Sequence, residues 1–482
     1  MLTETITTQI VTLELPADLE TPISVYLKLR GQGPSFLLES IEGGERIARY
    51  SFIGVSPKAQ YILRGDQVEI ITSEGRQIVT LEPGSDPTNF LQAQMSLYQS
   101  RPQPGLPRFI GGLVGYLGYE SVRHFESTLK KQMNPDTTQI PDGIYLLADT
   151  VVAFDHARRT LFLIANVLDG DTAAAERKLD EIAARIHQPL PAAQKMSASP
   201  SEIKSNMTQA VFEGMVRTAK EHIAAGDIFQ VVLSQRFSRE TSVEAFDVYR
   251  AVRRLNPSPY MFFFDFGTLD GEPFYLAGAS PEMFVRLENR LASLRPIAGT
   301  RPRGQDESAD AALAANLLAD PKERAEHVML VDLGRNDLGR VCEYGSVKVS
   351  EFAIIERYSH VMHIVSHVEG ALLPELTAFD LVRAAFPAGT VSGAPKVRAM
   401  EIIANLEPDA RGAYAGMVGY FGFDGNMDTC LAIRTMVGRG GIVSVQAGAG
   451  IVADSDPASE YQETVNKASA MLRAIEMAET NS

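Results

Sequence analysis

The distribution of strand-forming and helix-forming stretches restricts the folds open to this chain more than any other feature. Runs of β-forming residues between turn residues predict strands in the first third of the sequence, at 48–54, 60–72 and 145–155. Later strand-like runs are mixed with helical stretches and lie at 228–237, 282–291 and 442–448. The regular strand–helix alternation of parallel α/β folds is missing from the sequence. We therefore expect an α+β fold.

A segment without periodicity divides the chain near residue 200. Residues Gln188 to Glu202 are rich in Pro, Ala and Ser, which is typical of a linker or surface loop. A helical stretch precedes it at 172–186, and another follows at 208–227 and ends at a glycine. We expect three parts, namely an N-terminal region, a linker or loop and a second region, over 1–187, 188–205 and 206–478.

Two pairs of glutamates carry the clearest chemical signal. Glu323 and Glu326 form one pair, and Glu460 and Glu463 form the other, each with a spacing of three residues. On a helix this spacing places both carboxylates of a pair on one face, so each pair can address one hard cation such as magnesium. Early glutamates also complement the positive end of a helix dipole, which is the structural alternative for either pair alone.

Helix start signals precede both pairs. Asp320 and Asp456 are good N-cap residues, and each is followed by a proline at the first helical position, Pro321 and Pro457. Both glutamate pairs are therefore expected in the first turns of helices. Four carboxylates are then available to converge on one magnesium ion.

Several segments near these pairs are too rich in Gly, Pro, Ser and Thr for ordinary core. Exposed N–H groups and hydroxyls in such segments can donate to carboxylate oxygens. They lie at 295–304, 360–366, 386–400 and 445–457. In order and content they resemble the chorismate-utilising enzymes, and most closely the anthranilate synthase component I family.

The resemblance covers nearly the whole chain. It is dense from 205 to 474 and thinner from 1 to 170, where Leu37–Ser40, Arg49–Gly54 and Gly111–Glu120 carry it. It implies two large β-sheets packed against each other and flanked by helices, with both halves of the chain in one compact body. It also implies chorismate as substrate and Mg²⁺ as cofactor.

The resemblance assigns roles to particular residues. Glu326 and Glu463 would be direct magnesium ligands, with Glu323 and Glu460 in support. The substrate-binding residues would be Gly299, Thr300, Tyr414, Arg434, Gly448, Ala449, Gly450 and Lys467. Judged alone, Arg434 also fits a strand surface, Tyr414 a core, 448–450 a tight turn and 299–300 a β-bulge.

The reaction that the resemblance implies adds ammonia at ring C2 with loss of the C4 hydroxyl, and then eliminates pyruvate. Hydroxide leaves poorly near neutral pH, so a general acid is needed, and Glu282 matches that role if burial raises its pKa. His363 would serve the elimination step, and Thr390 would complete the catalytic set. From the residues alone, His363 also fits a core histidine.

Two positions separate the members of this family. Water-adding relatives carry a lysine base where this chain has Gln230, and many aminodeoxychorismate synthases carry a nucleophilic lysine where it has Ala298. Neither replacement can perform those reactions, so anthranilate is the favoured product. The nearest alternative is aminodeoxychorismate synthase component I, and a more distant one is a catalytically idle amino-acid sensor.

The source of ammonia is expected to be a separate chain. A glutaminase needs a catalytic cysteine on a strand-turn-helix elbow, and neither Cys342 nor Cys430 lies in such a context. We therefore expect a glutamine amidotransferase partner, anthranilate synthase component II, in a heterotetramer of two large and two small subunits. Free ammonium should replace glutamine.

Two further strings resemble the halves of a tryptophan pocket through which this family is inhibited. They contribute Leu38, Glu39 and Ser40 from one string and Pro259, Tyr260 and Met261 from the other. A strand end against a turn is the structural alternative. The hypothesis is feedback inhibition by L-tryptophan.

Composition agrees with a cytoplasmic enzyme. The 482 residues are 45% hydrophobic, which suffices for a large core. The net charge of −15 disfavours nucleic acid and anionic membranes as partners. The N-terminus lacks a signal-peptide pattern, and no uninterrupted apolar run is long enough for a membrane span.

Overall fold

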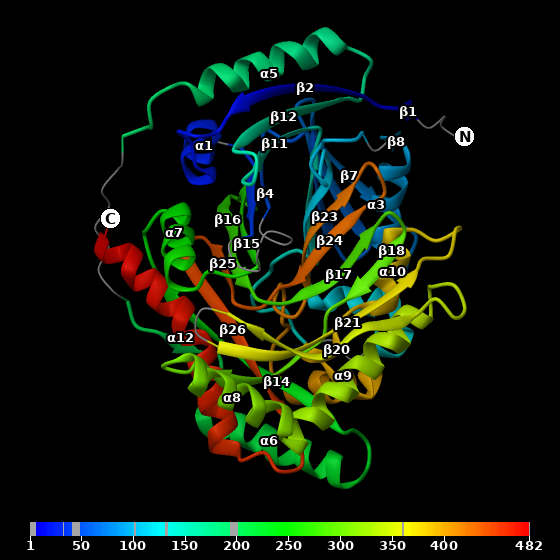
Figure 1. Ribbon diagram of the computed structural model, residues 1–482, viewed down its shortest axis with the longest axis vertical. Coiled ribbons are helices and arrows are strands. Elements are labelled where there is room, and N and C mark those ends of the chain that lie inside the picture. Colours follow the sequence, from blue (N-terminus) through cyan, green and yellow to red (C-terminus); the bar gives the residue numbers. More distant parts are fainter. Residues whose placement is uncertain are drawn as a thin grey trace.

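Two twelve-stranded sheets form the centre of this computed structural model (Figure 1). The structure describes residues 6–31, 33–40, 49–100, 103–130, 134–192, 201–358 and 361–481. Neighbouring strands in both sheets run antiparallel. The prediction of an α+β fold with two large sheets is confirmed.

The first sheet contains the strand order β19-β21-β18-β17-β24-β23-β9-β10-β5-β6-β7, with β20 also paired to β21. In chain order its strands are β5 (Ala59–Arg64), β6 (Gln67–Thr72), β7 (Gly75–Thr80), β9 (Gly112–Leu117), β10 (Gly143–Ala148), β17 (Met283–Glu288), β18 (Leu291–Leu294), β19 (Ile297–Pro302), β20 (Lys348–Arg357), β21 (Val361–Ala371), β23 (Met417–Gly422) and β24 (Met427–Leu431).

The second sheet has the order β13-β14-β26-β25-β16-β15-β3-β4-β11-β12-β2, with β22 also paired to β14. Its strands are β2 (Gln9–Pro16), β3 (Ser35–Glu39), β4 (Tyr50–Val55), β11 (Thr150–Asp155), β12 (Thr160–Val167), β13 (Lys204–Ser205), β14 (Gln230–Glu240), β15 (Tyr260–Leu269), β16 (Glu272–Ser280), β22 (Gly393–Ala394), β25 (Thr435–Arg439) and β26 (Ile442–Ile451). A separate parallel pair joins β1 (Ile6–Thr7) to β8 (Tyr98–Gln99).

The interior between the sheets is packed with aromatic rings from both of them. Phe52 of β4 and Tyr420 of β23 meet edge to face, with ring centroids 6.1 Å apart. Phe109 stacks on Tyr420 at 4.2 Å and also contacts Phe52. Gly54 leaves the space that the Phe36 ring fills, because a Cβ there would lie 2.1 Å from that ring. The aromatic core therefore joins the two sheets into one body.

Helices cover the outer faces of the sheets (Figure 1). They are α1 (Pro22–Leu29), α3 (Pro87–Ser96), α4 (Val122–Phe125), α5 (Thr172–Ile186), α6 (Gln209–Ala224), α7 (Ala245–Leu255), α8 (Glu307–Ala319), α9 (Pro321–Gly339), α10 (Ala378–Ala385), α11 (Lys396–Leu406) and α12 (Pro457–Asn481), with 3₁₀ turns η1 (Tyr119–Ser121), η2 (Ser127–Leu129) and η3 (Gly389–Val391).

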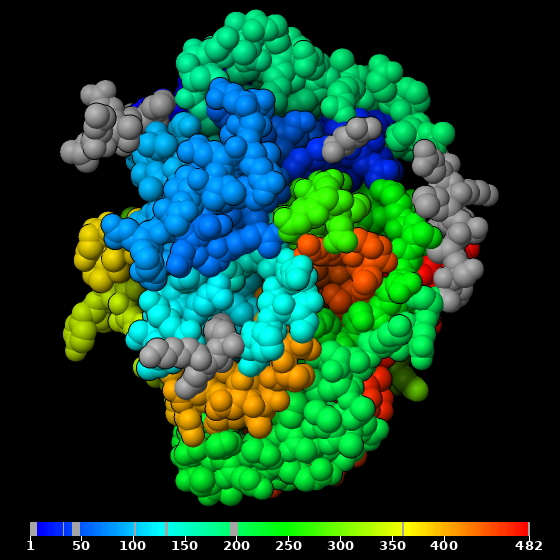
Figure 2. Space-filling view, turned by 180° about the vertical axis from the view of Figure 1, so that it is seen from behind, coloured from blue at the N-terminus to red at the C-terminus, as the bar shows by residue number. Residues whose placement is uncertain are grey.

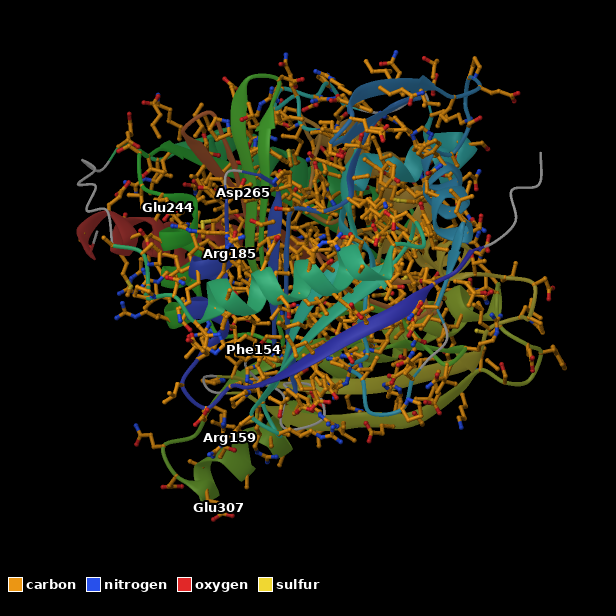
Figure 3. The ribbon with its side chains drawn as sticks, turned by 90° about the horizontal axis from the view of Figure 1, so that it is seen from above. Phe154, Arg159, Arg185, Glu244, Asp265 and Glu307 are labelled. Atoms are coloured by element: carbon orange, nitrogen blue, oxygen red, sulfur yellow. The ribbon has the colours of Figure 1, made fainter. Side chains whose placement is uncertain are left out.

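Helix α5 shows how these coverings are attached. It lies across β12 and β2 of the second sheet, and Arg185 near its end is seen from above in Figure 3. The Arg185 guanidinium donates to the carbonyl of Leu29, at the end of α1. The buried residues of α5, Leu179, Ile182 and Ile186, recur at helical spacing and face the sheet.

The predicted helix starts are confirmed. The Asp320 carboxylate accepts from the N–H groups of Lys322 and Glu323 at 3.0 and 3.3 Å, and Pro321 opens α9. Asp456 accepts from the N–H of Ser459 at 3.0 Å at the start of α12. Helices α5 and α6 occupy the two helical stretches predicted on either side of residues 188–202.

The strands before residue 188 form one continuous part of each sheet, and the strands after residue 202 form the rest. Strand β9 pairs with β23 in the first sheet, and β3 pairs with β15 in the second. From behind, early residues (cyan) and late residues (orange) lie side by side (Figure 2), and the Asn134 amide donates to the carbonyl of Glu407 at 2.9 Å. The domain division stays a prediction, and residues 193–200 of the predicted linker or loop lie outside the described residues.

Among the described residues, no helix combines the length and the apolar character needed to cross a membrane.

Candidate active site

Glu282 lies between β16 and β17 and is held by a loop from elsewhere in the chain. The hydroxyl of Thr390, in η3, donates to Glu282 Oε1 at 2.8 Å. Burial raises the pKa of Glu282 to about 7, although the Thr390 hydrogen bond and the charge of Lys467 act in the opposite direction. A carboxyl group with this pKa can donate a proton near neutral pH.

His363 lies on β21, opposite the Gly299–Thr300 segment of β19. Its Nδ1 donates to the carbonyl of Gly299 at 2.8 Å and lies 3.2 Å from the Thr300 hydroxyl. Burial lowers the pKa of His363, so the ring is neutral at pH 7. With the proton on Nδ1, Nε2 is an acceptor. The pairing of β19 with β21 shifts register between Ala298 and Arg301, so the segment does form a bulge.

The first glutamate pair lies at the start of α9. Glu326 Oε1 accepts from the Gln230 side chain at 3.1 Å. Burial raises the pKa of Glu326, and the charges of Glu323 and Glu463 raise it further. Glu323 also accepts from Arg301 at 3.1 Å. Gln230 thus lies beside the predicted metal ligands.

The second pair lies at the start of α12. Glu463 forms an ion pair with Lys467, one helical turn later, at 2.6 Å. Burial raises the pKa of Glu460, and the charge of Glu463 adds to the effect. The repulsion among these carboxylates is what a bound divalent cation would relieve.

The four carboxylates do not form a ready ligand group. Within the part of the chain that the structure describes, no three His, Cys, Asp or Glu side chains are arranged to hold a metal ion. The expected convergence on one ion is therefore not seen in this geometry. Oxygen donors at this density fit a hard cation such as magnesium, and the role of Glu323, Glu326, Glu460 and Glu463 stays a prediction.

The predicted carboxylate-binding residues do come together. Arg434 follows β24 with a left-handed backbone (φ of 51°), and its guanidinium donates to the carbonyl of Lys467 at 2.8 Å. Lys467 Nζ donates to the carbonyl of Gly448 at 3.0 Å. A Cβ on Gly448 would lie 2.5 Å from the Tyr414 hydroxyl, so only glycine leaves room for that ring. Lys467 and Tyr414 therefore meet at the strand of Gly448, and Arg434 is joined to them through the backbone of Lys467.

That strand is β26, so residues 448–450 are not a tight turn. It pairs with β14 throughout, whereas β25 pairs with it only as far as Val445. Gly450 lies against the Gln230 amide, where a Cβ would be 2.6 Å from Nε2. The methyl group of Ala449 is buried in an apolar cluster, so only its backbone can meet a ligand. Ala298 is buried on β19.

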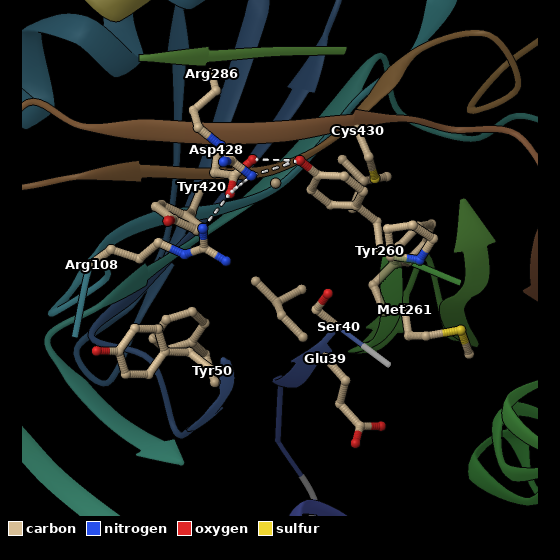
Figure 4. Close-up of a pocket in the computed structure, with 16 residues that line it drawn as sticks. Glu39, Ser40, Tyr50, Arg108, Tyr260, Met261, Arg286, Tyr420, Asp428 and Cys430 are labelled. Carbon is tan, nitrogen blue, oxygen red and sulfur yellow. Dashed lines mark hydrogen bonds and ion pairs between the residues drawn. The ribbon is translucent and has the colours of Figure 1, made fainter. Parts of the chain in front are cut away.

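A pocket lies between the two sheets (Figure 4). All six residues predicted for a tryptophan pocket line it, namely Leu38, Glu39, Ser40, Pro259, Tyr260 and Met261. The Ser40 hydroxyl is buried and has no hydrogen-bond partner among the described residues. An unsatisfied hydroxyl that lines a pocket is a candidate partner for a polar group on a ligand.

Met261 packs in the apolar cluster that contains Tyr249 of α7, and its ladder partner Glu39 points the same way. The Glu39 carboxylate points away from the cavity and accepts from the Tyr249 hydroxyl at 2.6 Å and from Arg253 at 3.0 and 3.1 Å. Figure 4 shows it turned from the pocket centre. Its side chain therefore fixes α7 to β3, and only its backbone is available to a ligand.

One wall of this cavity was not predicted. Asp428 pairs with Arg286 at 2.9 Å and accepts from the Tyr260 hydroxyl at 3.0 Å, and Arg108 lies 3.6 Å from its other oxygen (Figure 4). The further lining residues include Tyr50, Phe52, Tyr420 and Cys430. Charged residues inside the apolar strands β17 and β24 are the signal that was available in the sequence.

Comparison with known proteins points to one family. Residues 33–473 match the family model described as chorismate binding enzyme. Anthranilate synthase component 1 of Pseudomonas putida is 48% identical over 477 residues, which cover 97% of this chain and 95% of that protein.

Solved structures give the same grouping. The crystal structure of anthranilate synthase component I from Streptococcus pneumoniae matches with a TM-score of 0.79 and 39% identity, over 95% of this chain and 98% of that one. The menaquinone-specific isochorismate synthase of Escherichia coli shares the fold, with a TM-score of 0.71 and 20% identity over 97% of this chain and 95% of its own. The chain therefore belongs to the chorismate-binding enzyme family and, within it, to the anthranilate synthase component 1 group.

Proposed function

We propose that this protein converts chorismate and ammonia to anthranilate and pyruvate, as the large subunit of an anthranilate synthase in tryptophan biosynthesis. The observation that carries the proposal is the placement of Glu282. Its carboxyl group, with a pKa of about 7, lies within electrostatic reach of Lys467, which belongs to the carboxylate-binding set. A proton donor and an anion-binding group thus share one site.

The first step joins ammonia to ring C2 while the ring double bonds shift and the C4–O bond breaks. Glu282 supplies the proton with which the hydroxyl leaves as water. Thr390 keeps the carboxyl group in place through its 2.8 Å hydrogen bond. Arg434, Tyr414 and Lys467 hold a substrate carboxylate in the meantime.

The second step removes the C2 proton and breaks the C3–O bond, which releases pyruvate as its enol and makes the ring aromatic. We assign the proton transfer to His363, because its neutral Nε2 is free to accept a proton while Nδ1–H is held by Gly299. Gly299 and Thr300 bind the substrate beside it.

Two neighbouring residues set the product. Gln230 lies where a base for water would be needed, and an amide cannot take up that proton. Ala298 presents a methyl group where a lysine nucleophile would be needed. Both features favour anthranilate over isochorismate or 4-amino-4-deoxychorismate.

Magnesium would be held by Glu326 and Glu463, with Glu323 and Glu460 in support. When bound, it would offset the charge of a substrate carboxylate and of the glutamates themselves. The raised pKa values of Glu326 and Glu460 support this assignment.

The ammonia source is a separate glutamine amidotransferase, since the relatives are named component 1 and are of this length. We assign the pair to a cytoplasmic heterotetramer of two large and two small subunits. The cavity lined by Ser40 and Tyr260 is the site of feedback inhibition by L-tryptophan, because it offers an unsatisfied hydroxyl within an aromatic and aliphatic wall.

The test is the reaction of the purified chain with chorismate, a magnesium salt and an ammonium salt. Formation of a fluorescent product that elutes with anthranilate, together with pyruvate, is expected. A non-fluorescent 4-amino adduct would instead identify an aminodeoxychorismate synthase. No product with ammonium would count against this proposal and would favour either the amino-acid sensor or an obligatory partner subunit.

A further inference from the structure

Arg411 is a buried arginine directly behind the site, in the segment that joins α11 to β23. Only 3% of its surface is exposed. Its Nε and Nη2 donate to the two oxygens of Glu407 at 2.8 and 2.6 Å. A charge as deeply buried as this is retained only when its donors are satisfied, and here they are.

Its remaining donors bind backbone carbonyls on two elements of the site. Nη1 donates to Val391 at 2.8 Å, and Val391 follows Thr390 in η3. Nη2 donates to Val232 at 2.7 Å, and Val232 is the partner of Gly450 in the ladder between β14 and β26. One guanidinium therefore ties the Thr390 turn to β14, the strand that pairs with the Gly448–Gly450 segment of β26.

The same guanidinium also lies over two tyrosines. Its centre is 5.6 Å from the ring of Tyr414 and 4.7 Å from that of Tyr119. Tyr414 is the residue whose hydroxyl reaches Gly448. Because cation–π contacts favour one placement of the ring, Arg411 also restricts Tyr414.

The backbone of Arg411 is fixed from the other half of the chain. Its N–H donates to Glu120 Oε1 at 2.7 Å, and the N–H of Gly412 donates to Glu120 Oε2 at 2.9 Å. The backbone from which the guanidinium extends is therefore held in place. The guanidinium in turn fixes the positions of η3 and β14.

We propose that Arg411 is a positioning residue for the reaction, which sets the Thr390 hydroxyl against Glu282 and the Tyr414 ring against the substrate carboxylate. The hydrogen bonds of its guanidinium go to Glu407, Val391 and Val232, so it acts through these neighbours. This inference rests on the proposed function, since it assigns Arg411 a task in that chemistry. Lysine cannot replace it, because one ammonium cannot reach Glu407 and two separate carbonyls in the geometry of a planar fork.

The chain offers a matched control in Arg239. It is likewise 3% exposed, and it pairs with Glu479 at 2.9 Å and Glu476 at 3.4 Å, between β14 and the end of α12. None of these partners belongs to the site. Arg239→Lys and Arg411→Lys therefore each replace a guanidinium at an equally buried position, and only the second concerns the reaction.

The experiment compares ammonium-dependent kcat of the two variants across pH, at a fixed concentration of free NH₃. Arg411→Lys should lower kcat about 100-fold, as expected for a loss of alignment near 1 Å. It should also move the alkaline limb of kcat to higher pH, because a displaced Thr390 no longer lowers the pKa of Glu282. Lys467, the other group acting on Glu282, is left in place. Arg239→Lys should lower the melting temperature but leave both kcat and the limb unchanged.

Glu407→Gln is the second variant, in case Arg411→Lys does not fold. It loosens the guanidinium from outside the site and should move the limb in the same direction, by a smaller amount. The inference is overturned if the folded variants of Arg411 or Glu407 keep the wild-type limb, or if Arg239→Lys shifts it equally. Failure of the proposed function is separate, since it would appear as an absence of anthranilate from the wild-type chain.

Discussion

At the scale of single residues, the most consequential feature is a carboxyl group that is half-protonated near neutral pH. Since Glu282 acts as an acid, kcat should fall as pH rises through about 7, the pKa that burial gives it. Thr390→Val removes a hydrogen bond that lowers this pKa, so the fall should move to higher pH, while Thr390→Ser should retain it. The check is kcat against pH at constant free NH₃. If the pH at which kcat falls is the same in Thr390→Val and in the wild type, Glu282 is not the general acid.

The same carboxyl group has a cost in stability. Its pKa is about 7 in the folded chain and 4.5 as the ordinary value, so folding binds the proton more tightly. Its contribution is most favourable below pH 4.5 and is lost as pH rises past 7. Glu282→Gln cannot ionise, so it should be more stable than wild type at pH 8.5 by about 3 kcal/mol, with little difference at pH 4.5. Urea unfolding at both pH values measures this, and an equal difference at both would contradict it.

Ser40 offers a prediction about inhibition. Its unsatisfied hydroxyl faces the cavity, so Ser40→Phe should fill the space and abolish inhibition by tryptophan while uninhibited kcat stays the same. The chain contains no tryptophan, so the fluorescence of the bound amino acid reports binding directly. Ser40→Ala is the milder variant and should weaken binding by about 1 kcal/mol. Unchanged inhibition in Ser40→Phe would place the effector elsewhere.

The residues predicted for each site lie near one another in the structure, yet the sequence did not show how they touch. The contact of Thr390 with Glu282 joins positions 108 apart, and that of Tyr260 with Asp428 joins positions 168 apart. Glu39 has the right position and the wrong direction, because two partners on α7 take its carboxylate. Side-chain direction depends on such tertiary partners, and no local pattern contains them.

At the scale of elements, the helix starts were predictable because capping is local chemistry. Asp456 caps α12, which carries Glu460 and Glu463, while Asp171 caps α5 by accepting from the N–H of Ala174 at 2.8 Å. Asp456→Ala and Asp171→Ala should each destabilise the protein by about 1 kcal/mol. Only Asp456→Ala should raise the magnesium concentration needed for half-maximal activity. A magnesium titration of both variants decides, and an equal effect would mean that α12 does not present ligands.

Strand partners were much less predictable than strands. The stretch 145–155 was predicted as strand, and it is strand, but it changes sheets at Asp149, between β10 and β11. Both flanks are equally apolar because both sheets bury them. A hydrophobic pattern records burial and not the identity of the partner, so the order of strands is decided by packing across the whole chain.

At the scale of the whole molecule, the two halves of the chain depend on each other. In each sheet, one strand from the N-terminal half pairs with one from the C-terminal half. These pairs are β9 with β23 and β3 with β15. A protease site inserted between 192 and 201 should give two fragments that stay associated and unfold in one transition. Either fragment expressed alone should fail to fold, because it would expose two apolar strand edges. Calorimetry of the cut protein checks this, and two separate transitions would contradict it.

The pairing of β9 with β23 affects how the chain folds during its synthesis. Leu117 pairs with Met417, so the ribosome adds 300 residues between one strand and its neighbour. At ordinary rates of translation this takes roughly 15 to 60 s. All six residues of β9 are buried in the finished fold, and until then one edge of this strand has no partner. The nascent chain therefore presents an open, apolar edge throughout that interval, which is when a holding chaperone would be of most use to it.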